Sequence, residues 1–141
     1  MLIRPGIDAD RPCLRTLYLN TRLTSWAWLE SDNCRLEDFD AVTQDEHIWV
    51  AEIDGQLAGF ASVWTRDNFL HNLFVSPDWQ GHGVGSALLK KVQSELTDTG
   101  SLKCLAQNTQ ALRFYQRHGW QTTACGTSPD GEYWLMHYPV R

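Results

Sequence analysis

A glycine-rich loop between a strand and a helix is the feature that most limits how this chain can fold. The run Leu73-Phe74-Val75 predicts a buried strand, Ser76-Pro77-Asp78 ends it, and an amphipathic helix follows Gly81, Gly83 and Gly85. Glycine permits backbone conformations that a Cβ obstructs, and the first turn of a helix carries unpaired N–H groups and partial positive charge. We therefore expect the loop to hold an anion such as a pyrophosphate.

Two common phosphate-binding motifs do not fit this loop. A dinucleotide fingerprint needs a third glycine, but the position counted from Gly81 and Gly83 is Ser86. A P-loop needs a lysine after its last glycine, and no lysine precedes Lys90. Residues 80–85 instead fit the signature Q/R-x-x-G-x-G/A. In this motif the chain resembles the GCN5-related N-acetyltransferases, whose loop of this form binds the pyrophosphate of acetyl-CoA.

A second motif strengthens the resemblance. The sequence from Asn108 to Trp120, N-x-x-A-x-x-F-Y-x-x-x-G-W, is similar to the second cofactor segment of that family, with Trp in place of the final Phe. The resemblance implies that the cofactor lies between two parallel strands that separate, and that the strand ending at Val75 offers backbone hydrogen bonds to pantetheine. The cofactor-binding residues that it implies are Leu73, Phe74, Val75, Gln80, Gly81, His82, Gly83, Val84, Gly85, Ser86, Asn108, Ala111 and Phe114.

The pattern of apolar residues predicts the element order β-α-α-β-β-β-α-β-α-β-β in a single domain spanning residues 1–141. With the resemblance, this order implies an α+β, three-layer fold with a mixed, mostly antiparallel sheet of six to seven strands and about four helices. Asp54-Gly55 predicts a tight hairpin turn, and Asn108 is expected to cap a helix. The strands are expected at 1–7, 48–53, 57–64, 68–75, 102–106, 120–125 and 133–138.

Composition limits the partners. The net charge of −5, from 12 basic and 17 acidic residues, argues against nucleic-acid binding and suits a cationic substrate. No run of 18 apolar residues predicts a membrane span. The four cysteines form no CxxC pair and no amino-terminal leader is evident, so reduced thiols, a cytoplasmic location and no metal are expected.

Two residues are candidates for proton transfer. A primary amine is mostly protonated at neutral pH, so its attack on a thioester needs a proton acceptor, and the departing thiolate needs a proton. The resemblance places Tyr115 as the general acid; the alternative is that Tyr115 only packs beside Phe114. His71 is the candidate base, because residues 69, 71, 73 and 75 of one strand are expected to share a face. A structural histidine, Glu52 acting through water, or water alone remain alternatives.

The pattern Leu70-His71-Asn72-Leu73 is similar to the arylalkylamine N-acetyltransferases, in which a strand histidine assists deprotonation. His82 stands where the wider family often has Arg or Lys, so its role stays open.

The acceptor is expected to be the amine of a small molecule. Trp26 and Trp28 lie in a segment that often lines the acceptor pocket in the family, with Glu30 and Asp32 nearby, and Tyr133 and Trp134 lie on the last hairpin. Packing in a core or interface is the alternative for these aromatic residues. A protein lysine or amino terminus is the alternative acceptor, and a non-catalytic acyl-CoA-binding module is the alternative class. A homodimer through the last strands is a family-level expectation.

Overall fold

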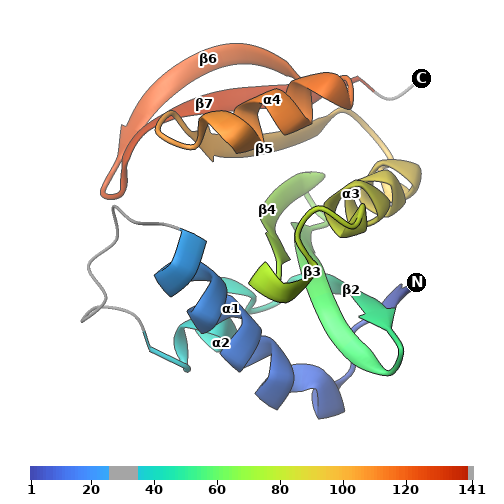
Figure 1. The fold of residues 1–141 in the computed structure, drawn as a ribbon. Helices are drawn as coiled ribbons and strands as arrows, with labels where there is room; N and C mark the ends of the chain where they lie inside the picture. The colour runs from blue at the N-terminus through green and yellow to red at the C-terminus, as the bar shows by residue number, and fades with distance from the viewer. Residues whose placement is uncertain (26–34, 140–141) are drawn as a thin grey trace.

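The computed structural model describes residues 1–25 and 35–139 (Figure 1). Its strands are β1 (Leu2–Pro5), β2 (His47–Ile53), β3 (Gln56–Trp64), β4 (Phe69–Val75), β5 (Gly100–Leu105), β6 (Gln121–Ser128) and β7 (Gly131–Tyr138). Its α-helices are α1 (Arg11–Ser25), α2 (Asp38–Val42), α3 (Val84–Glu95) and α4 (Thr109–Arg117). The predicted element order is confirmed.

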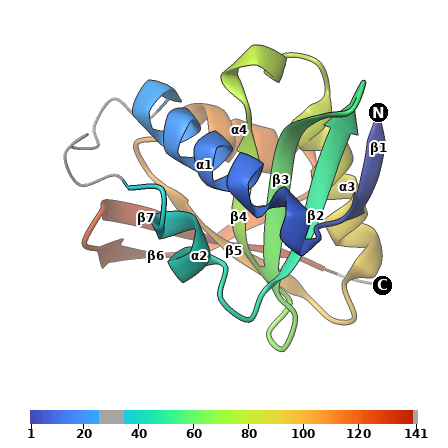
Figure 2. The same cartoon turned by 90° about the horizontal axis from the view of Figure 1, so that it is seen from below.

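The strands form one mixed sheet between two layers of helices. The strand order is β1-β2-β3-β4-β5-β7-β6, and every neighbouring pair is antiparallel except β4 and β5. Helices α1 and α2 cover one face, and α3 and α4 cover the other (Figure 2). The predicted α+β fold with a mostly antiparallel sheet is therefore confirmed. No helix in the two described ranges is long and apolar enough to cross a membrane.

Each face of the sheet has its own apolar core. Under α1 and α2, four aromatic rings pack edge to face or stacked: Tyr18, Phe39, Phe60 and Phe74. Under α3 and α4, the core is mainly aliphatic and is closed by the buried Trp120. The two cores hold the helices against the central strands, which fixes both the start of α3 and the start of α4 relative to β4.

Local signals for turns and caps are confirmed. Asp54 and Gly55 have φ of 52° and 79°, as a tight β2–β3 hairpin requires. The backbone N–H of Ala111 donates to Asn108 Oδ1 over 3.2 Å, so Asn108 caps α4. Pro5 lies on β1, an edge strand, where its missing N–H breaks no ladder.

Strand β4 has two unlike edges. Its residues pair with β3 from Phe69 to Val75, but with β5 only at Phe69 and Leu70. Beyond Leu70 the two parallel strands separate, which leaves backbone groups along one edge of β4 outside the ladder. This separation, expected from the resemblance, is the origin of the cavity described next.

Candidate active site

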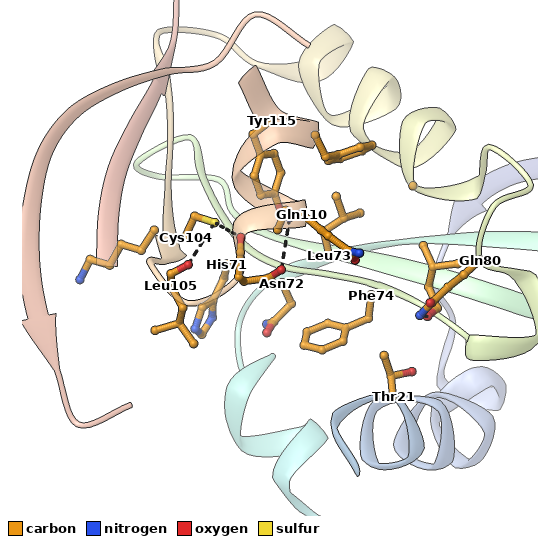
Figure 3. A pocket seen from close by; sticks show the side chains of 16 residues that line it. Thr21, His71, Asn72, Leu73, Phe74, Gln80, Cys104, Leu105, Gln110 and Tyr115 are labelled. Carbon is orange, nitrogen blue, oxygen red and sulfur yellow. Dashed lines mark hydrogen bonds between the residues drawn. The ribbon is translucent and has the colours of Figure 1, made fainter. Parts of the chain in front are cut away.

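A cavity of about 380 Å³ opens where β4 and β5 separate (Figure 3). Strand β4 and the start of α3 form one wall, and β5 and α4 form the other. The residues that the sequence predicts for the site and that line the cavity are His71, Leu73, Phe74, Val75, Gln80, Gly85, Asn108, Ala111, Phe114 and Tyr115. The two sequence motifs, which are separated by 22 residues (86–107) in the chain, therefore meet at one site.

The glycine loop shapes the start of α3. Gly81 and Gly83 have φ of 83° and 80°, in the left-handed region that favours glycine. Gly83 is the N-cap of α3, and no side chain accepts a hydrogen bond from the first turn of this helix. The first-turn N–H groups are thus left for an anion. Val84 is buried in the core, and neither it nor Ser86 lines the cavity.

Two side chains brace the loop from within. Gln80 Nε2 donates to the carbonyl oxygen of Val75 over 3.2 Å, which ties the loop to the end of β4. His82 Nδ1 lies 3.2 Å from the carbonyl oxygen of Trp79 and 3.1 Å from that of Gln80, and its ring packs against the Trp79 ring. His82 does not line the cavity. Its position supports a role in bracing the loop.

Tyr115 projects from α4 into the cavity (Figure 3). Burial, and secondarily the nearby Cys104, raise the pKa of Tyr115 well above its ordinary value, so the hydroxyl keeps its proton at neutral pH. In the described part of the chain, no residue forms a hydrogen bond with this hydroxyl. Burial also raises the pKa of Cys104 to about 11, so this thiol is a poor nucleophile at neutral pH.

His71 occupies a β-bulge. Ser62 pairs with Asn72 and Val63 pairs with Leu70, so His71 is the extra residue on β4. The expectation that His71 shares a face with residues 73 and 75 is wrong, because the bulge interrupts the two-residue alternation. Residues 70, 73 and 75 pack on the α3 side, whereas His71 and Asn72 contact Glu46 and Val42 beside α2. His71 nevertheless lines the cavity.

Glu46, in the turn before β2, is the residue that sequence reasoning missed beside His71. Its Oε2 lies 2.6 Å from His71 Nδ1, and its side chain is only 6% exposed. The hydrogen bond to Glu46 raises the pKa of His71, while burial opposes this shift. Twenty-five residues separate the two in the chain, so no local pattern could have indicated the pair.

Several other residues that the sequence indicated are not found at the cavity. Glu52 accepts a hydrogen bond from Arg4 over 3.1 Å and does not line the cavity, so the structure does not support it as a base. Tyr133 and Trp134, on β7, do not line the cavity either. Trp26, Trp28, Glu30 and Asp32 lie outside the described residues. The cavity residues that the sequence did not indicate are Thr21, Asn72, Lys103, Cys104, Leu105 and Gln110.

The cavity suits an extended thioester cofactor. Strand backbone that β5 does not pair with lies along one wall, an uncapped helix start stands at one end, and a protonated tyrosine stands further along. Within the described ranges, no group of three or more His, Cys, Asp or Glu side chains could hold a metal ion. These features suit an enzyme that transfers an acyl group from a thioester.

Comparison with known proteins identifies the family. Residues 44–122 match the model of the acetyltransferase (GNAT) domain. The chain is 28% identical to the peptidyl-lysine N-acetyltransferase YiaC of Escherichia coli, over 99% of this chain and 97% of YiaC. It is 31% identical to the L-amino acid N-acyltransferase MnaT of Escherichia coli, over 88% of this chain and 81% of MnaT.

Comparison with solved structures agrees with this family. The yncA protein of Salmonella typhimurium, solved with its cofactor acetyl-CoA, superposes with a TM-score of 0.76 at 23% identity, covering 100% of this chain and 94% of yncA. The chain belongs to the GNAT acetyltransferase family. It is an acetyl-CoA-dependent N-acetyltransferase.

Proposed function

We propose that the protein transfers the acetyl group of acetyl-CoA to the primary amine of a small molecule, with Tyr115 as general acid and His71 as general base. The observation that carries the proposal is the cavity between β4 and β5. It has the glycine loop at one end and, among the described residues, an unpartnered Tyr115 hydroxyl and the His71 ring further along. The net charge of −5 suits a cationic amine.

Different residues of the chain bind different parts of acetyl-CoA. Acetyl-CoA, when bound, supplies a thioester carbonyl for the amine nitrogen to attack and a thiolate that departs as the C–S bond breaks. The first-turn N–H groups of α3 and the backbone of Gly81 and Gly83 hold the pyrophosphate. The edge of β4 that β5 does not pair with, beyond Leu70, binds the pantetheine amides, and Ala111 and Phe114 of α4 pack against the other side of the pantetheine.

Proton transfer occurs at the opposite end of the cavity. His71 accepts one proton from the ammonium form of the acceptor, which leaves the neutral amine to attack the thioester carbonyl, and later releases this proton to solvent. Tyr115 donates its hydroxyl proton to the departing sulfur, and the second proton, which the nitrogen loses as the C–N bond forms, returns to Tyr115 through solvent. The products are the acetylated amine, the free CoA thiol and one proton. Because the pKa of Tyr115 is raised, the hydroxyl stays protonated at neutral pH.

A protein lysine is the second candidate acceptor. Similarity to the peptidyl-lysine acetyltransferase YiaC over 99% of this chain favours it. Similarity to the L-amino acid acyltransferase MnaT over 88% of this chain favours a small molecule. Both acceptors present a primary amine to the same cavity, so the chemistry at Tyr115 and His71 is common to them.

Thiol release from acetyl-CoA tests the proposal. The purified protein is assayed with L-methionine, kanamycin and a lysine-containing peptide, and the acetylated product is identified by mass spectrometry. Acetylation of L-methionine or kanamycin supports the small-molecule acceptor, and acetylation of the peptide alone supports the second candidate. Acetyl-CoA binding without thiol release on a wider amine panel would contradict both and favour a non-catalytic binding module.

A further inference from the structure

We propose that Glu46 is a positioning residue for His71. Its carboxylate accepts the Nδ1–H of the imidazole and so selects the tautomer in which Nε2 is free to take the proton of the acceptor amine. The inference rests on the proposed function, and it adds a residue from the turn between α2 and β2 to a site otherwise built from β4, β5, α3 and α4.

The geometry of the pair favours one tautomer. Glu46 Oε2 lies 2.6 Å from His71 Nδ1, the distance of a strong charge-assisted hydrogen bond. A carboxylate can only accept, so Nδ1 must carry the proton, and the neutral ring then has its lone pair on Nε2. The backbone of Val42 also lies within hydrogen-bonding reach of the ring, and the His71 side chain is 42% exposed at the cavity.

The bulge on β4 holds the ring in place. Asn72, the next residue, donates through Nδ2 to Ser62 Oγ over 2.7 Å and to the carbonyl oxygen of Val42 over 3.5 Å. Asn72 is therefore fastened to β3 and to the end of α2, and His71 is fastened to Glu46 in the turn that follows α2. The imidazole cannot turn toward α3 as regular alternation would direct it, because this segment fixes its orientation.

The burial of the Glu46 carboxylate is unfavourable for folding, and a purely structural residue at this position would avoid this penalty. Its Oε1 is buried and has no hydrogen-bond partner in the described part of the chain. Burying a carboxylate oxygen without a partner is unfavourable, and an apolar side chain would fill the same space without this penalty. A function that needs the charge explains why an acidic residue is present here.

The charges around His71 set the sign of its pH dependence. Glu46 approaches it from the turn before β2, and Lys103 approaches from β5 and acts in the opposite direction. The Glu46 hydrogen bond, with a smaller contribution from the backbone of Val42, outweighs burial and Lys103, so the pKa of His71 is raised above 6.5. A base must be unprotonated to act, so kcat/KM should rise with pH through this raised pKa and be lost below it.

The first test uses the unmodified protein without any ligand. Nitrogen-15 NMR of the histidine rings, with His71 assigned by comparison with His71→Gln, reports the tautomer above the His71 pKa. We expect protonated Nδ1 and unprotonated Nε2. The opposite tautomer would overturn the proposal, and this measurement does not depend on finding an acceptor.

The second test is Glu46→Gln. A glutamine amide can donate to Nδ1 and select the wrong tautomer, so kcat should fall about tenfold or more, as loss of a tautomer-setting carboxylate does elsewhere. Loss of the negative charge should also move both the NMR titration of His71 and the acid limb of kcat/KM to lower pH. Glu46→Asp, which keeps the charge, should restore part of the turnover.

Glu52→Gln is the matched control, since it removes a carboxylate that pairs with Arg4 away from the cavity. It should leave kcat and the acid limb unchanged. The kinetics use L-methionine, kanamycin or the lysine peptide, whichever is acetylated. If the titration of His71 moves in Glu46→Gln but the acid limb does not, the pair is structural and the proposal fails. If no amine is acetylated by the unmodified protein, the proposed function fails, while the tautomer still decides the pairing.

Discussion

The two ends of the cavity are built in different ways. At the loop end, the shape comes from backbone: Gly81 and Gly83 adopt positive φ, and the first turn of α3 has no side-chain cap. At the other end, the shape comes from side chains of separate elements, with Tyr115 on α4, His71 on β4 and Glu46 before β2.

Under the proposed function, this difference separates binding from chemistry. Backbone N–H groups attract an anion whatever side chains surround them, so we expect the loop end to contribute affinity. Proton transfer needs particular side chains at particular positions, so we expect the other end to contribute turnover. Substitutions at the loop end should therefore change acetyl-CoA affinity, and substitutions at the other end should change kcat.

Tyr115→Phe should give the largest effect, a loss of kcat. It removes the hydroxyl but keeps a ring that packs near Phe114 and Trp120. Loss of a general acid lowers kcat by about 100-fold or more. The KM for acetyl-CoA should change by less than about threefold, because the lost interaction is made in the transition state. Steady-state kinetics with varied acetyl-CoA measure both.

Tyr138→Phe is the control for this substitution. Tyr138 also packs against Trp120, with ring centroids 5.4 Å apart, but it does not line the cavity. Its loss of a hydroxyl should leave kcat unchanged. Unchanged turnover in Tyr115→Phe would remove the general-acid assignment and leave packing as the role of Tyr115.

Gly83→Ala should give the next effect, on binding. A Cβ at Gly83 meets no atom within 4 Å, so the penalty comes from its φ of 80° alone. Forcing alanine into the left-handed region costs about 1–2 kcal/mol. Relief of that strain should turn the loop N–H groups away from the anion and weaken acetyl-CoA binding about tenfold. Isothermal titration calorimetry and thermal unfolding measure the two effects.

Gly55→Ala is a close match for Gly83→Ala. Gly55 lies in the β2–β3 turn with φ of 79° and also has no atom within 4 Å of an added Cβ. It should lose similar stability without any change in acetyl-CoA affinity. An equal loss of affinity in both variants would mean that the loop contributes only through global stability.

The loop end could be predicted from sequence because its determinants are local. A strand ending at Val75, glycines at fixed spacing and the Asn108 cap each act within a few residues of their own position. The Asp54-Gly55 hairpin is another local signal, and it fixes the pairing of β2 with β3. These elements, and hence their order along the chain, follow from short-range rules.

The other end could not be predicted, for a physical reason. Whether His71 points toward α2 or α3 depends on the register of β4 against β3, where one extra residue changes the face. The contact with Glu46 depends in turn on where the segment after α2 crosses the sheet. Neither feature leaves a periodicity in the sequence, so strand alternation gave the wrong face for His71.

Gly85→Ala should have the smallest effect on acetyl-CoA affinity. It tests whether every glycine of the loop is needed for its φ angle. Gly85 lies in the first turn of α3, and an added Cβ would lie 3.5 Å from Phe114 Cζ and 3.6 Å from Val75 Cγ2, which are ordinary contacts. Alanine favours a helix over glycine, so the free energy of unfolding should rise by about 0.5 kcal/mol. Acetyl-CoA affinity, measured by calorimetry, should change less than about twofold, since about 0.4 kcal/mol corresponds to that ratio. A tenfold loss of acetyl-CoA affinity with unchanged or higher stability would instead mean that the cofactor passes directly over the Gly85 Cα. Close approach of the cofactor would then be a second reason for glycine in this loop, beside positive φ.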